Sequence, residues 1–593
     1  MNKLYTKKGL IALSILVQAA IYPGAKAQTL NLQNVTKQGF SGLEPLDNSG
    51  YYIKYYEGLQ RAEKGKKAIF HIYSLNNDLE IRSDFKLELL PSDEIEDLSF
   101  NSGNYFLIYS NVAKKTRTFK LLSSSGNELA SKVIEDVKYR NLGKPAVIIP
   151  AGDSDFIVIN YIKDKKIGYS IEKYNSKMEA VFSSNQTPEK GKLYPVDYLL
   201  SAGKLFVLEF ADRDFDDHFE YYVNSFDLTN GTSVNKTYLT SEDGKKFGYP
   251  SFIRASKNGG VIAGGMYFDN QRVQETNSDG FFSTYIPSQG KPVSTYIDWK
   301  LVKDQVGNGS TSAMWGGKNK TFMHDISVNA DGSYVLIGEN YRKGDSKLSG
   351  DKSKNGFAIA SKALSVSGGD ESDLALTAAE FVLFDFDASG AYKGIRTIDK
   401  PNSVTILKAS TEDRPFGGEF KGLNIANILN NYGYFPYRFT AETNNGKYLV
   451  YYLKHEKKPE ELVYFTPLNA TTAENTHTDI TGGEMKVLAE LNNKVVSSLG
   501  LGNAFAKLNK IAKATGTDDS EENVFEVKGS HDPFDFRAKH LNSRIYPSNI
   551  PGKILVYDFV PNIDEKEKNN FLAKMINSAN GSMKIYYLDI PVK

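Results

Sequence analysis

The chain has 593 residues, with 72 Lys and Arg, 71 Asp and Glu, and no cysteine. Its 40% hydrophobic and 24% charged content is ordinary for a globular chain and excludes collagen-like and wholly disordered classes. The charge balance argues against nucleic-acid binding, and the missing cysteine excludes a disulfide scaffold, cysteine-ligated zinc, iron–sulfur clusters, thiol catalysis and an acylated lipoprotein cysteine. Length alone predicts about four domains, unless the chain is built from repeats.

The first residues have the pattern of a secretory signal peptide. A short basic segment precedes the apolar run Gly9–Ile21, and Ala25 and Ala27 then supply small residues before Gln28. The apolar run is too short to cross a membrane as a helix, which needs roughly 20 residues, and no later stretch approaches a transmembrane span. We therefore expect residues 1–27 to be a bacterial signal peptide and residues 28–593 to be exported, to the periplasm, the outer surface or the cell exterior.

One unit recurs through the rest of the chain: a turn glycine followed by a short apolar strand rich in Tyr, Phe, Ile and Val. The eight unit starts are Gly65, Gly103, Gly152, Gly203, Gly259, Gly332, Gly446 and Gly552. Many units have a second strand that ends in a polar turn, as at Phe226–Gly231, Tyr285–Gly290 and Phe381–Gly390. Two hairpins per unit give about four strands, which is the composition of a propeller blade. A sandwich or a solenoid also uses short strands, but a sandwich does not explain equal starts and a solenoid needs shorter units.

Two units also resemble a known group. Phe252–Gly265, followed by Ser278–Tyr285, and His324–Gly338 are similar to the repeat of secreted bacterial β-propeller proteins. The resemblance implies an all-β propeller in an envelope or extracellular setting. Its motif residues form turns, so the resemblance implies no catalytic site.

We therefore predict a single all-β propeller of seven or eight four-stranded blades, with the N-terminal strand closing the last blade. For this closure, Tyr51–Tyr56 is expected to pair with the C-terminal strand Met583–Ile590, because pairing protects both strand edges. Insertions are expected near residues 300–320, 343–373 and 470–535. Within or near them, Asn503–Gly516 and Asp564–Gly581 have helical patterns and are expected to cover a face of the ring or dock a partner.

Local catalytic signatures are missing from the sequence. The seven histidines are scattered, and the sequence has neither a zinc-protease H-E-x-x-H motif nor a G-x-S-x-G nucleophile elbow. The densest acidic cluster contains Asp212, Asp214 and Asp216, whose alternating carboxylates make it the candidate for calcium. It departs from the EF-hand loop at the sixth and twelfth positions and contains Arg213, so a solvated hairpin tip is the simpler interpretation. No other metal or cofactor is expected.

Four residues are candidate binding residues. Trp299 and Trp315 stand in a long inter-unit loop, where an exposed indole stacks on a sugar or anchors a partner. His531 and Arg537 belong to a polar-aromatic segment that joins an irregular stretch to the last unit, where a turn fixed by Asp532-Pro533 is the simpler interpretation.

The resulting functional prediction is an exported, non-catalytic, monomeric β-propeller that binds a protein or glycan partner at the cell envelope or outside the cell. A propeller-type glycan hydrolase or lyase is the first alternative, because catalytic carboxylates meet in space and 71 acids are present. A structural envelope component is the second alternative.

Overall fold

The computed structural model is almost entirely β-structure, built from antiparallel hairpins. It describes residues 29–36, 39–57, 68–90, 92–135, 145–163, 166–212, 219–270, 278–306, 319–345, 374–398, 400, 403–407, 435–454, 461–470, 476–479, 523–527, 543–561 and 580–591. The predicted signal peptide, the helix Asn503–Gly516 and nearly all of the helix Asp564–Gly581 lie outside these residues. No helix in the described ranges is long and apolar enough to cross a membrane.

In the first half of the chain, the described strands form four-stranded antiparallel sets in chain order. The first set holds β2 (Phe40–Leu46), β3 (Gly50–Glu57), β4 (Ala68–Asn76) and β5 (Ile81–Leu89). The second set holds β6 (Asp93–Asn101), β7 (Asn104–Asn111), β8 (Thr116–Ser123) and β9 (Glu128–Ile134). The third set holds β10 (Val147–Ala151), β11 (Asp155–Lys163), β12 (Ile167–Tyr174) and β13 (Ala180–Gln186). The fourth set holds β14 (Lys192–Ser201), β15 (Lys204–Asp212), β16 (Phe219–Asp227) and β17 (Ser233–Tyr238). One parallel pair, Ile167 with Lys192, links the third and fourth sets into an eight-stranded sheet.

The second half repeats the arrangement with additions. The fifth set holds β18 (Phe247–Ala255), β19 (Val261–Phe268), β20 (Gly280–Ile286) and β21 (Val293–Asp298), followed by the helix α3 (Trp299–Val306). The sixth set holds β22 (Asn319–Val328), β23 (Tyr334–Asp345), β24 (Leu374–Phe386) and β25 (Tyr392–Ile398), and β26 (Ser403–Leu407) and β31 (Asn523–Val527) extend its sheet. The seventh set holds β27 (Tyr437–Thr443), β28 (Gly446–Lys454), β29 (Glu461–Pro467) and β30 (Thr476–Asp479).

The two ends of the described chain meet in one further sheet, which we call the terminal set. It has the order β1 (Thr29–Thr36), β34 (Asn580–Asp589), β33 (Lys553–Pro561) and β32 (Ser543–Pro547). The predicted partner of the C-terminal strand is therefore wrong: β1 pairs with β34, whereas Tyr51–Tyr56 lies in β3 and pairs with β2 and β4. The predicted pairing of an N-terminal strand with the C-terminal strand does occur, but with β1, two strands earlier in the chain than predicted.

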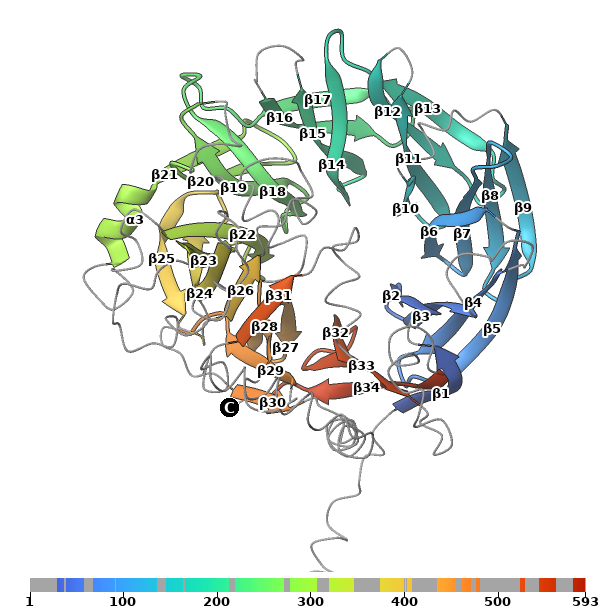
Figure 1. The fold of residues 1–593 in the computed structure, drawn as a ribbon. Helices are drawn as coiled ribbons and strands as arrows, with labels where there is room; N and C mark the ends of the chain where they lie inside the picture. Colours follow the sequence, from blue (N-terminus) through green and yellow to red (C-terminus); the bar gives the residue numbers. More distant parts are fainter. Residues whose placement is uncertain are drawn as a thin grey trace, which may run out of the picture.

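Figure 1 shows the sets side by side in chain order around one centre, with β1 and β34 adjacent. Neighbouring sets bury their apolar faces against each other. The first set packs Tyr52 and Phe70 against Tyr105 of the second set. The seventh set packs Val450 against Val556 of the terminal set, and the terminal set packs on the first through another cluster. The core is thus a series of layers between sheets.

Tyrosine supplies much of this packing. The largest fully buried side chains are all tyrosines: Tyr51, Tyr52, Tyr105, Tyr169, Tyr174, Tyr267, Tyr334, Tyr341, Tyr451 and Tyr557. A phenol fills a large volume between sheets and needs a partner for its hydroxyl group. Tyr52 OH donates to Leu98 O of the next set at 2.9 Å, and Tyr334 OH is 2.8 Å from Ser283 Oγ of the preceding set. The surplus of tyrosine therefore joins the sets to each other.

Candidate functional site

The candidate site is built on turns that join the first strand of a set to its second strand. Asn329–Ser333 joins β22 to β23; Gly332 has φ 89°, where L-residues are strained, and its N–H donates to Asn329 O. Asp331 accepts a hydrogen bond from Ser333 N at 2.9 Å. In the fifth set, the Ser256 Oγ accepts from Gly260 N at 2.9 Å. These local bonds fix the turns, and the side chains between them project from a rigid backbone.

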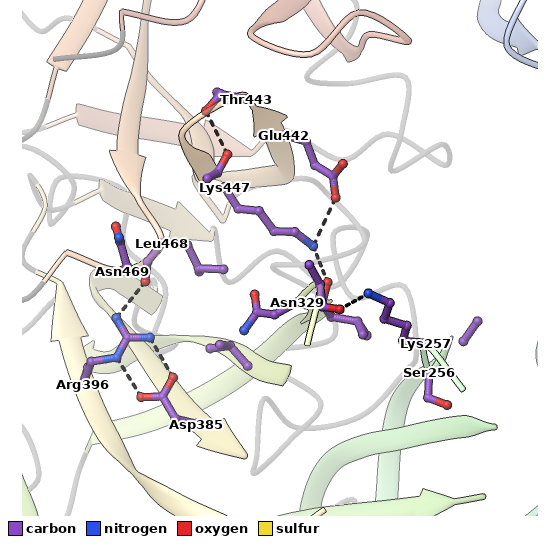
Figure 2. Close-up of a pocket in the computed structure, with 15 residues that line it drawn as sticks. Ser256, Lys257, Asn329, Asp385, Arg396, Glu442, Thr443, Lys447, Leu468 and Asn469 are labelled. Carbon is purple, nitrogen blue, oxygen red and sulfur yellow. Dashed lines mark hydrogen bonds and ion pairs between the residues drawn. The ribbon is translucent and has the colours of Figure 1, made fainter. Parts of the chain in front are cut away.

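Three such turns enclose a pocket of about 590 Å³ (Figure 2). They come from the fifth, sixth and seventh sets, and the third-to-fourth strand region of the sixth and seventh sets completes the wall. The lining residues are Ala255, Ser256, Lys257, Val328, Asn329, Ala330, Val335, Asp385, Arg396, Glu442, Thr443, Gly446, Lys447, Leu468 and Asn469. Val335 and Leu468 are each 4% exposed and form part of an apolar floor, while most of the remaining lining side chains are polar.

Arg396 fixes one side of the pocket. Its Nε and Nη2 donate to the two carboxylate oxygens of Asp385, each at 2.7 Å. Its Nη1 donates to Leu468 O of the seventh set at 2.7 Å. This bidentate geometry is the strongest arrangement of an arginine and a carboxylate. The pair therefore holds the sixth and seventh sets together and presents a preformed polar wall.

Two lysines fix the other side. Lys257, from the fifth set, donates to Ala330 O of the sixth set. Lys447, from the seventh set, donates to Val328 O of the same strand-turn segment and lies 3.2 Å from Glu442 Oε1. Figure 2 shows both side chains reaching toward the segment around Asn329. The two ammonium groups thus flank one three-residue segment.

The pocket combines paired charges with neutral polar groups. Both lining carboxylates are in ion pairs, Asp385 with Arg396 and Glu442 with Lys447. Amides, hydroxyls and cations around an apolar floor are the groups that orient a polar ligand.

A second polar cluster lies between the sheets and is closed to solvent. Glu339 Oε1 is 2.7 Å from Lys400 Nζ, and both side chains are 0% exposed. Glu339 Oε2 is 3.1 Å from His324 Nε2. Burial raises the pKa of Glu339, but Lys400 and His324 outweigh burial, and the pKa is held below its usual value. No substrate reaches this buried triad, which we interpret as part of the packing.

Aspartates on the first strands also join the sets. Asp97 Oδ2 accepts from Ile148 N at 2.7 Å, and Asp197 Oδ2 accepts from Ile253 N at 2.9 Å. Each aspartate directly follows a β-bulge in its strand, which turns its side chain toward the next set. Burial raises the pKa of both carboxyls, although these hydrogen bonds oppose the shift.

Of the predicted binding residues, Trp299 alone lies within the described ranges, and it does not line this pocket. Trp299 starts α3 instead of lying in an extended loop; its Nε1 donates to Ser278 Oγ at 3.0 Å, and its ring packs near Phe281 and Phe384. Its half-buried indole thus contributes to the packing between the fifth and sixth sets. Trp315, His531 and Arg537 lie outside the described residues, and their predicted binding role stays a prediction.

Of the three predicted calcium ligands, Asp212 alone lies within the described residues. Asp212 ends β15, and its Oδ2 lies 3.2 Å from Lys192 Nζ. Asp214 and Asp216 lie outside the described residues, so calcium binding there stays a prediction. Elsewhere in the described part of the chain, no three His, Cys, Asp or Glu side chains are placed to hold a metal.

The pocket residues are not among those that the sequence predicts for binding. Each is an ordinary polar residue in or beside a turn, and Lys257 precedes its turn glycine by two positions whereas Lys447 follows its own by one. No shared spacing marks them. The usable signal was the repeat itself, because aligned turns of consecutive units come together on one face of a ring.

Comparisons with known proteins give a family and distant structural similarities. Residues 104–480 match the family of unknown function DUF6770. No curated protein matches the chain. Among solved structures, a protein of unknown function from Bacteroides caccae has 13% identity and a TM-score of 0.23, covering 45% of this chain and 78% of its own.

Two other solved structures cover more of the chain. The WD40 domain of SCAP from fission yeast has 5% identity and a TM-score of 0.34, covering 77% of this chain and 91% of its own. The polysaccharide lyase Uly1 has 9% identity and a TM-score of 0.34, covering 84% of this chain and 90% of its own.

Proposed function

The chain belongs to the family of unknown function DUF6770, and we propose that it is an exported, monomeric, eight-bladed β-propeller that binds a glycan without transforming it. The binding site is the pocket between the fifth, sixth and seventh sets. The observation that carries the proposal is a preformed pocket lined mainly by polar side chains, in which each of the two carboxylates lies beside a cation.

Sheet order supports the propeller. Each four-stranded set corresponds to one blade, successive sets pack face to face, and the terminal set combines a strand from one end of the described chain with three from the other. Such pairing removes free edges and joins the ends of the ring. The seven sets in chain order and the terminal set make eight blades.

The N-terminal residues support export. The basic segment, apolar run and Ala25-Lys26-Ala27 have the order of a signal peptide, and β1 begins at Thr29, directly after the expected cleavage site. Cleavage therefore leaves the whole of β1 in the mature chain.

The size and chemistry of the pocket support a glycan. About 590 Å³ is within the usual range of small-ligand sites, whereas a protein partner needs a larger and flatter surface. The amides of Asn329 and Asn469 and the hydroxyls of Ser256 and Thr443 match the donors and acceptors of sugar hydroxyl groups. The apolar floor provides a surface for the C–H groups of a sugar ring.

A glycan array followed by calorimetry on the full exported chain tests the proposal. Asn469→Trp places an indole at an exposed lining position and is expected to abolish binding of any glycan that the wild type captures. Asn235→Trp, at an exposed position on β17 away from the pocket, is the matched control and should bind normally. Equal binding by wild type and Asn469→Trp would contradict this site.

Incubation of each captured glycan with the protein separates binding from catalysis. New reducing ends, or the ultraviolet absorbance of an unsaturated product, would establish the hydrolase or lyase alternative. We expect neither, because Asp385 and Glu442 are each committed to a cation.

A further inference from the structure

Lys257 and Lys447 approach the sixth set from its two neighbours. Their acceptors, Ala330 O and Val328 O, lie two residues apart on one strand-turn segment. Both acceptors are neutral carbonyl groups, which orient an ammonium group but do not cancel its charge. The two positive charges are therefore fixed on either side of Asn329, at the edge of the pocket.

Both lysines have ammonium N–H donors that make no hydrogen bond to a described residue. An ammonium group has three N–H donors. Within the described residues, Lys257 uses one of them, for Ala330 O. Lys447 uses one for Val328 O and lies near Glu442, whose side chain is 70% exposed. At least two N–H groups of Lys257 and one of Lys447 thus remain for a ligand or water.

The charges around the pocket favour an anion. Three cations and two carboxylates line it, in a chain whose overall charge is close to neutral. Arg396 is paired with Asp385 and Lys447 with the largely exposed Glu442, so the one surplus positive charge of the lining lies on Lys257. The acid that Lys257 influences is Asp331, whose pKa is lowered mainly by hydrogen bonds from Ser333 and to a smaller extent by Lys257. Among the described residues, Asp331 makes hydrogen bonds with Ser333 and none with Lys257.

We propose that the glycan bound in this pocket is acidic, and that Lys257 and Lys447 together hold its carboxylate or sulfate group. The inference rests on the proposed glycan-binding function and adds the class of ligand. Two ammonium groups from different blades, already oriented by carbonyl groups, lose little side-chain entropy when an anion binds between them. Arg396 and Asp385 on the opposite wall then face the neutral hydroxyls of the same ligand.

Matched pairs of polymers test the inference by calorimetry at about 0.15 M salt, where long-range charge effects are screened. Dextran sulfate is compared with dextran, and oligogalacturonate with its methyl ester. We expect the charged member of at least one pair to bind at least tenfold more tightly. The double variant K257Q/K447Q keeps donors for the two carbonyl groups but removes both charges, and is expected to weaken that binding by roughly fivefold for each lysine.

Two control variants separate this site from general charge effects and from loss of fold. K245Q removes one charge from a lysine that is 80% exposed and does not line the pocket, and should leave binding unchanged. K257R/K447R keeps both charges and should retain most of the affinity, and the thermal unfolding of all variants should match that of the wild type.

The possible failures are distinguishable. Equal binding of charged and uncharged polymers, both blocked by Asn469→Trp, would overturn the acidic ligand while leaving glycan binding intact. A loss of affinity in K245Q as large as in K257Q/K447Q would also overturn it, because the attraction would then be nonspecific. No binding of any polymer on the array or in calorimetry would overturn the glycan-binding function itself, and the acidic ligand with it.

Discussion

Replacing Lys400 by methionine should destabilise the sixth set, because the buried carboxylate of Glu339 then loses its partner. Lys400 Nζ lies 2.7 Å from Glu339 Oε1, and neither side chain is exposed to solvent. Methionine preserves most of the volume and the apolar contact with Phe381, over which the ammonium lies at 5.4 Å. The substitution therefore removes one charge and little packing.

The size of the effect follows from burial. Removing one partner of a buried ion pair costs about 3–5 kcal/mol, because the other charge stays without compensation. His324 remains 3.1 Å from Glu339 and offsets part of this cost, so we expect about 3 kcal/mol. In the double variant K400M/E339Q no charge is stranded, and the loss should be smaller than in K400M alone.

The pH dependence has a defined sign. The pKa of Glu339 is lowered in the folded chain, so its contribution to stability is complete above the unfolded carboxyl pKa and is lost as the pH falls through the folded value. The difference in stability between wild type and K400M should therefore be full at pH 7 and shrink under acid conditions.

Urea unfolding, followed by circular dichroism and by tryptophan fluorescence excited at 295 nm, measures these differences. Trp299 lies 6.3 Å from Phe384 of the sixth set and reports on the sheet that contains the ion pair. A loss below about 1 kcal/mol in K400M, or a double variant whose loss equals the sum of the two single losses, would refute the reasoning.

Three further predictions concern the scaffold. Gly265→Ala should lower the thermal midpoint, because a Cβ there would lie 2.2 Å from Tyr249 O, whereas Gly394→Ala, with nothing within 4 Å, should change it little. Asp197→Ala should cost about 1–3 kcal/mol in urea unfolding by leaving the amide of Ile253 without its acceptor; a loss as small as that of a surface substitution would contradict this role. Stability should fall as the pH rises above 10, because buried phenols ionise only in the unfolded chain; a spectrophotometric titration in which all tyrosines ionise reversibly near pH 10 would show otherwise. The phenols with raised pKa include those of Tyr52, Tyr169 and Tyr437.

The repeat was readable from sequence because one physical requirement recurs in every unit. A tight turn between the first and second strands needs a residue with positive φ, and glycine meets that need without strain. Seven of the eight predicted glycines do have positive φ at that turn: Gly103, Gly152, Gly203, Gly259, Gly332, Gly446 and Gly552. Gly65 lies outside the described residues, and Gly50 (φ 155°) occupies the turn of the first set. The pattern of a glycine before an apolar strand also occurs ahead of β4, where Gly65 precedes Ala68. The pattern alone therefore does not identify the turn between the first and second strands.

The N-terminal partner of the closing strand was misassigned for a different reason. Tyr51–Tyr56 is strongly apolar because β3 is a middle strand, buried on both faces. β1 is an outermost strand, in which only Leu30 and Val35 are buried, so its sequence is mostly polar. Apolarity therefore selects middle strands and overlooks outermost ones. The pocket was overlooked because it depends on three turns that are about 70 to 190 residues apart in the sequence, and none is unusual by itself.

The placement of charge in the molecule supports the proposed binding function. An acid that acts in catalysis needs both access to a substrate and a proton that it can exchange near neutral pH. Glu339 and Glu209 are enclosed, at 0% and 1% exposure, and are satisfied by neighbouring side chains. The acids that a ligand in the pocket can reach, Asp385 and Glu442, are held by Arg396 and Lys447. In the described scaffold the enclosed acids are out of reach of a ligand, and the unpaired hydrogen-bonding groups of the pocket are ammonium, amide and hydroxyl groups, as the proposed binding function requires.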